Sequence, residues 1–126
     1  PDRAIDGTSF VEVLTGKPIR RVTPLYWHYY NALGAPKAAM RAGGWMVLGS
    51  WGQKDQRGGG FFRESDQKLV KTMELKHFEL YNLKRDRDQK KNLAETEPAR
   101  LKELSVQLVK KYREVQAGGP EWKFGK

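Results

Sequence analysis

Cysteine is absent from the chain, and its absence removes several kinds of chemistry at once. The sequence has no disulfide framework, no thiolate-based zinc site and no thiol nucleophile. Histidine is scarce as well, because His28 and His77 are the only two and lie far apart, which does not suit a local metal-binding motif. No apolar run approaches the roughly 20 residues that a membrane-spanning helix needs. We therefore expect neither a metal site nor membrane contact.

Acidic residues are outnumbered. The 126 residues include 24 Lys and Arg against 15 Asp and Glu, a formal net charge of +9. Such an excess suits an anionic partner, but the charge by itself does not choose among nucleic acid, a membrane surface and a sulfated or phosphorylated ligand. Toward the C-terminus, Lys and Arg alternate with acidic residues, as in KRDRD at 84–88. This mixing favours a role in solubility over a continuous row of cations that contacts a phosphate backbone. Nucleic acid is therefore not the favoured partner.

The chain divides into a leading segment, 1–23, and a folded unit, 24–126. The first residue is Pro1 rather than methionine, so we expect a piece of a larger protein. The apolar residues within 10–14 predict a short helix, which Gly16 and Pro18 end. A basic connector, 19–23, then leads into the folded unit.

The middle of the chain predicts strands. Aromatic residues crowd 24–31 and favour a strand, whereas Gly34 and Pro36 predict a loop over 32–36. Segments 38–41 and 45–51 predict a hairpin that turns at 42–44, and 77–83 predicts a further strand. Between them we expect a glycine-rich polar loop at 52–63 and a helix at 64–73, and after the last strand a solvated turn at 84–91.

The end of the chain carries the strongest pattern. From Pro98 to Gly118, apolar residues recur at helical spacing and form one stripe. The order of elements predicts an α+β fold, in which a small antiparallel sheet of about four strands packs with a long C-terminal α-helix. The stripe consists of Leu101, Leu104, Leu108, Val109, Tyr112 and Val115.

No catalytic pattern is visible. None of the serines lies in a nucleophile-elbow motif, and the two histidines are the only bases suited to a triad. The glycines at 58–60 lack the Gly-Lys-Ser/Thr ending of a phosphate-binding loop, which favours a plain flexible loop. A small independent hydrolase that uses His28 is therefore a remote alternative.

His28 lies in the middle of the aromatic strand. Strand alternation places it on one face with Tyr26 and Tyr30, and Trp27 and Tyr29 on the other. Two interpretations stay open: a half-buried imidazole with a structural role, which we favour, and a polar ligand contact on an aromatic wall.

Four phrases occur in one order along nearly the whole chain. They are DGTSF at 6–10 with LTG at 14–16, PLYW at 24–27, MRAGGWMVL at 40–48, and FELYNL at 78–83 with Asp86 and NLA at 92–94. Together they resemble the C-terminal end of the formylglycine-dependent sulfatases, the arylsulfatase family. Gly44 and Met46 stand where that family usually has Asp and Lys, and Arg87 and Gln89 replace a usual Pro and Glu. These are turn and surface positions, so the resemblance in fold survives, but polar contacts of the missing Asp and Lys do not carry over.

The resemblance implies a subdomain without chemistry of its own. Sulfatases hydrolyse sulfate esters with a formylglycine made from the Cys or Ser of a C/S-x-P-x-R motif, and with calcium held in the N-terminal catalytic domain. This chain contains no such motif, so no catalytic residue or cofactor is carried onto it. The implied role is to dock on the catalytic domain and to shape the cleft for a sulfated substrate. Parent enzymes are often periplasmic, secreted or lysosomal, and the sequence does not choose among these.

Five residues are candidates for substrate contact if the resemblance holds. His28, Tyr30 and Asn31 fit the rim of a cleft for a sulfated sugar, and Lys54 and Arg57 would attract sulfate from the glycine-rich loop. The alternative, which has equal weight, is that all five side chains are structural or solvated. We also expect the isolated chain to expose apolar surface at 10–14 and on one face of the aromatic strand, and to self-associate through it. The alternative function is a free-standing basic module that binds nucleic acid or another polyanion.

Overall fold

The computed structural model describes residues 7–19, 21–32, 35–52 and 64–123, with the backbone alone at 31–32 and 35–36. These residues form a four-stranded antiparallel sheet, a long C-terminal helix and one short helix, which confirms the predicted α+β fold. The elements are η1 (Val11–Thr15), β1 (Leu25–Ala32), β2 (Ala35–Ala42), β3 (Trp45–Ser50), α1 (Glu64–Thr72), β4 (His77–Asn82) and α2 (Pro98–Gly118).

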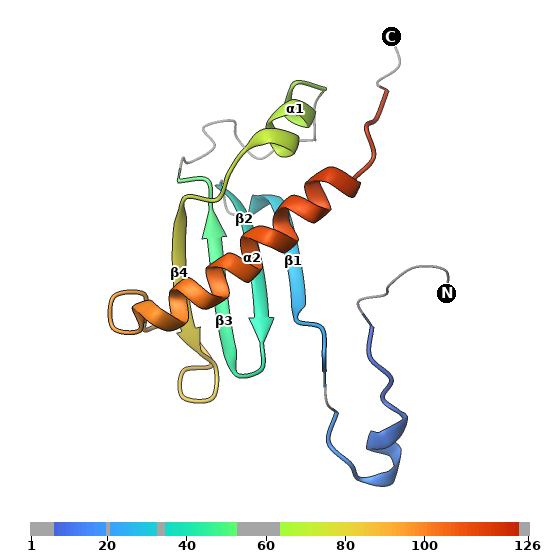
Figure 1. Ribbon diagram of the computed structural model, residues 1–126, viewed down its shortest axis with the longest axis vertical. Helices are drawn as coiled ribbons and strands as arrows, with labels where there is room; N and C mark the ends of the chain where they lie inside the picture. The colour runs from blue at the N-terminus through green and yellow to red at the C-terminus, as the bar shows by residue number, and fades with distance from the viewer. Residues whose placement is uncertain (1–6, 20, 33–34, 53–63, 124–126) are drawn as a thin grey trace.

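The sheet is a simple meander in the order β1-β2-β3-β4 (Figure 1). The turn between β2 and β3 has Gly43 at a φ of 59°, a value that a glycine-led hairpin turn requires. The predicted loop over 32–36 is wrong, because Ala35 already pairs with Ala32 and Pro36 lies within β2. The pairing register shifts opposite Pro36, and proline is tolerated at such irregularities since it has no N–H to give to the ladder.

One face of the sheet carries the core. Helix α2 crosses this face diagonally and contacts all four strands (Figure 1). Its buried side chains are Leu104, Leu108 and Tyr112, three members of the predicted stripe. They pack on alternate residues of the central strands, where Met40 and Val47 are paired and fully buried. The predicted stripe therefore marks the side of α2 that meets the sheet.

A close approach at Gly49 lets α2 sit tightly on β3. A β-carbon built there would lie 3.2 Å from Leu108 Cδ2 and only 2.9 Å from Leu75 Cδ1. Glycine is therefore the residue that fits without displacing its neighbours.

The outer edge of β4 is closed by the segment that follows it. Leu80 N–H donates to Asn92 Oδ1 at 3.0 Å, and Leu93 N–H donates to the Leu80 carbonyl at 2.8 Å. The Asp86 carboxylate accepts from the backbone N–H groups of Lys90 and Lys91, and these bonds lower its pKa. The predicted turn over 84–91 thus owes its shape to Asp86.

The opposite face of the sheet is open. Within the described residues, neither η1 nor α1 packs over it (Figure 1). Trp27 pairs with Ala39 and Tyr29 pairs with Lys37 on this face, and the two aromatic side chains are 48% and 65% exposed. We call this surface the open face; it comprises Leu25, Trp27, Tyr29, Lys37, Ala39, Arg41, Met46, Leu48, Ser50, His77 and Glu79. Tyr81 lies on the same side of the sheet but is buried, and its hydroxyl donates to Glu79.

The leading segment packs little of its apolar surface. The predicted short helix is present as the 3-10 helix η1, one turn ended by Gly16 in a left-handed conformation. None of its residues is buried, and Phe10, Val11 and Leu14 are among the exposed hydrophobic side chains. Together with the open face, this segment leaves the apolar exposure that the sequence predicts.

Candidate functional site

The aromatic strand β1 presents His28 to the helix side of the sheet. The His28 ring meets the Tyr112 ring edge-on at 5.1 Å between centroids, and Tyr30 meets Trp51 in the same way at 6.3 Å. The predicted alternation, with His28 and Tyr30 on one face and Trp27 on the other, is confirmed.

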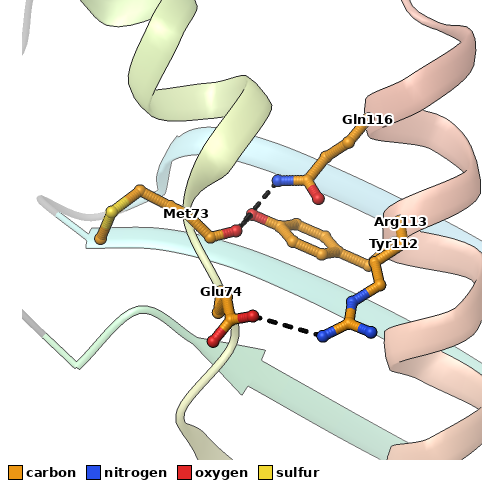
Figure 2. Close-up of polar contacts among 5 residues, drawn as sticks. All are labelled: Met73, Glu74, Tyr112, Arg113 and Gln116. Carbon is orange, nitrogen blue, oxygen red and sulfur yellow. Dashed lines mark hydrogen bonds and ion pairs between the residues drawn. The ribbon is translucent and has the colours of Figure 1, made fainter.

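Polar contacts tie α2 to β3 and to the segment after α1. The buried Trp51 indole donates to the Tyr112 hydroxyl at 2.8 Å, and that hydroxyl donates to the Met73 carbonyl at 3.0 Å. The Gln116 amide donates to the same carbonyl at 2.9 Å, and a further ion pair joins Arg113 to Glu74 (Figure 2). Burial raises the pKa of Tyr112, while the bond from Trp51 opposes that shift. The network fixes α2 in position, because the buried Trp51 indole and Tyr112 hydroxyl are both hydrogen-bonded within it.

A pocket of about 440 Å³ opens beside this network. It lies where the end of β1 meets α1, the last turns of α2 and the segment that follows α2. From the strand it is lined by His28, Tyr29 and Tyr30, where β1 reaches its end. Val70 and Lys71 line it from α1, and Val115 from α2. Three further lining residues used below are Gln67, Gln116 and Trp122.

The pocket wall carries little available charge. Burial lowers the pKa of His28, so the imidazole is neutral near pH 7. The Lys71 ammonium donates to the carbonyl oxygens of Gln116 and Gly119, at the end of α2 where the helix dipole favours a cation. His28 Nε2 and the Tyr26 hydroxyl are buried without a hydrogen-bond partner. The arrangement forms an apolar pocket rather than an anion-binding site.

The lowered pKa of His28 predicts a loss of stability in mild acid. The unfolded chain takes up the proton near pH 6.5, whereas the folded chain resists it, because burial disfavours the cation. The contribution of His28 to the free energy of unfolding is therefore fully present above pH 6.5. It is lost as the pH drops from 6.5 toward the lower pKa of His28 in the folded chain. In chemical denaturation between pH 7.5 and 5, we expect His28→Gln to flatten this loss.

The exposed His77 provides the matched control for that titration. His77→Gln is expected to keep the full wild-type loss between pH 7.5 and 5, because the side chain is exposed. Identical pH profiles for wild type and His28→Gln would show that burial of His28 does not act on stability.

The five candidate residues from the sequence are placed unequally. His28 and Tyr30 both line the pocket. The backbone of Asn31 belongs to β1, but its side chain, like Lys54 and Arg57, lies outside the described residues. Sequence reasoning missed Val70, Val115 and Trp122, which come from segments far from β1. Of these three, Trp122 could have been found by its residue type, since a tryptophan is unusual in a polar tail.

Other chemistry finds little support. Among the described residues, no group of three or more His, Asp or Glu side chains is placed to hold a metal ion. The calcium of the sulfatases therefore does not fit these residues, and no reaction step is derived through it. Over the same residues, no helix is both long and apolar enough to cross a bilayer.

No family model matches the sequence, and no curated protein matches it with significance.

Proposed function

We propose that the chain is the C-terminal subdomain of a formylglycine-dependent sulfatase, an enzyme that hydrolyses sulfate esters, with sulfated sugars as the proposed substrates. The four phrases described above carry this proposal, because they follow one another in that family's order over nearly the whole chain. The subdomain supplies no nucleophile and no metal ligand. Its roles are to dock on the N-terminal catalytic domain and to form part of the wall of the substrate cleft.

The shape of the molecule supports this proposal. A small antiparallel sheet backed by one long helix is the architecture that the resemblance implies. Apolar side chains remain uncovered on the open face and on the leading segment, where Val22 is 95% exposed. Exposed apolar side chains that lie together usually mark an interface, and Trp27 and Tyr29 project from the same strand on the open face. A large partner domain of the same protein would cover both the open face and the leading segment.

Removal of the Trp27 indole from the open face is expected to weaken association. In the isolated chain, this face has no partner and we expect concentration-dependent self-association through it. Trp27→Glu puts a charge in place of an indole that the contact would bury. We expect at least a tenfold weaker dimer by sedimentation equilibrium, since burial of a large apolar side chain contributes about 1.5–3 kcal/mol.

Trp122→Glu is the matched control for that experiment. Trp122 is 57% exposed but borders the pocket on the helix side of the sheet, so its replacement should leave the dimer unchanged. A wild-type chain that stays monomeric at all concentrations, or equal weakening by both variants, would remove the open face as an interface.

The second candidate function is a module that binds single-stranded nucleic acid. One observation favours it: Lys37 and Arg41 lie on the open face beside Tyr29 and Trp27, a combination of cations and aromatic rings on which bases stack. Fluorescence anisotropy with a labelled oligonucleotide at two salt concentrations separates the two candidates. Tight, salt-dependent binding that Trp27→Glu abolishes would favour the nucleic-acid module.

A further inference from the structure

The pocket beside α1 is a built cavity that the proposed docking role does not use. It lies on the helix side of the sheet, whereas docking uses the open face. Its volume of about 440 Å³ falls within the range of about 300–1,000 Å³ typical of small-molecule sites. Its walls come from four separate segments, and hydrogen bonds join three of them: α1, α2 and the segment after α2. The backbone N–H of Trp122 donates to Gln67 Oε1 at 2.7 Å, which holds the last segment against α1.

Lys71 and Gln116, two polar side chains around the pocket, are engaged by the protein itself, whereas the buried Nε2 of the lining His28 has no hydrogen-bond partner. Lys71 donates to two carbonyl oxygens at the end of α2. The Gln116 amide donates to the carbonyls of Val70 and Met73, at 2.8 and 2.9 Å. Because these groups are engaged, a charged ligand would lose its hydration and gain little in return.

The remaining surface is apolar and aromatic. Val70 and Val115 form aliphatic walls, and Tyr30 and Trp122 contribute aromatic rings. Aromatic rings pack well against other rings in edge-on or offset geometry. Trp122 lines the pocket and is 57% exposed.

We propose that this pocket binds an uncharged aromatic compound of one or two fused rings, which packs between Val115, Tyr30 and Trp122. The ligand excluded by the same surface is an anion of the same shape, because the neutral His28 offers it no charge and the Lys71 ammonium is engaged by two backbone carbonyls. This inference does not depend on the sulfatase proposal, since it concerns the chain by itself.

The test uses 2-naphthol as the uncharged probe and 2-naphthyl sulfate as its anionic counterpart. In a titration followed by two-dimensional NMR of the 126-residue chain, we expect saturable binding of 2-naphthol with a dissociation constant of about 0.1–1 mM, which suits a ligand of this size. The shifted signals should be those of Val70, Val115 and Trp122. We expect 2-naphthyl sulfate to bind at least tenfold more weakly.

Two valines on α2 provide matched variants. Val115→Trp should fill the pocket and weaken 2-naphthol binding at least tenfold, whereas Val106→Trp, on an exposed position of the same helix outside the pocket, should leave it unchanged. Trp122→Ala, beyond the end of α2, removes a wall without touching the core and should weaken binding severalfold.

Several results would overturn the proposal. They are the absence of saturable 2-naphthol binding, equal affinity for the sulfate, shifts centred on the open face, and full binding by both Val115→Trp and Trp122→Ala. Each of them leaves the sulfatase proposal standing, because none concerns the docking surface or sulfate hydrolysis in the complete protein.

Discussion

Leu108→Ala is expected to lower the free energy of unfolding by about 3 kcal/mol, within the 2–5 kcal/mol typical of a fully buried leucine. Leu108 is 0% exposed and fills the contact between α2 and β3, where its Cδ2 approaches Gly49. The truncation leaves a cavity that the tight helix–sheet contact is poorly able to close. In urea denaturation, we expect the midpoint to fall by about 1–3 M, since m-values of small proteins are about 1–3 kcal/mol per M.

Val106→Ala on the same helix is the control for this substitution. Val106 is 62% exposed, so its truncation should change the free energy of unfolding by less than about 0.5 kcal/mol. Equal effects of the two substitutions would mean that α2 does not pack on the sheet through Leu108.

The sequence carried enough local information to predict the main elements. The helical spacing of Leu104, Leu108 and Tyr112 identifies the buried side of α2, because a helix with one apolar stripe has one way to face a sheet. The glycines at 43–44 predict the central hairpin through their backbone freedom. Alternation along β1 separates His28 from Trp27, because strand side chains point to opposite faces.

Other features depend on contacts between distant segments, which a single sequence does not reveal. The hydrogen bond from Trp51 to Tyr112 joins residues 61 positions apart. The pocket likewise needs β1, α1 and the segment around Trp122 to meet, and no spacing rule links these segments. At Ala35 and Pro36, the local loop signal was overridden by pairing with β1, which a proline at an irregular position tolerates.

The largest effect predicted by the sulfatase proposal is a gain of sulfate release when this chain is joined to the rest of its protein. The isolated chain should hydrolyse no sulfate ester and respond to no added metal ion, because it has no Cys/Ser-x-Pro-x-Arg motif and its described residues hold no cluster of metal ligands. The complete protein should contain that motif, and its Cys or Ser should be converted to formylglycine. Enzymatic hydrolysis of this kind exceeds the uncatalysed rate by roughly a millionfold or more.

A variant of the complete protein provides the control for this assay. Replacement of the motif's Cys or Ser by Ala should abolish sulfate release while leaving the fold of the C-terminal subdomain intact. Mass spectrometry of the motif peptide separately confirms whether formylglycine is present.

The measurement that tests the central claim most directly is sulfate release by the complete protein, followed by ion chromatography over a panel of sulfated sugars and one aryl sulfate. The account predicts free sulfate from at least one of these compounds with the complete protein and none with the 126-residue chain. A complete protein that lacks the motif and releases no sulfate from any of them would contradict the account, as would release by the isolated chain.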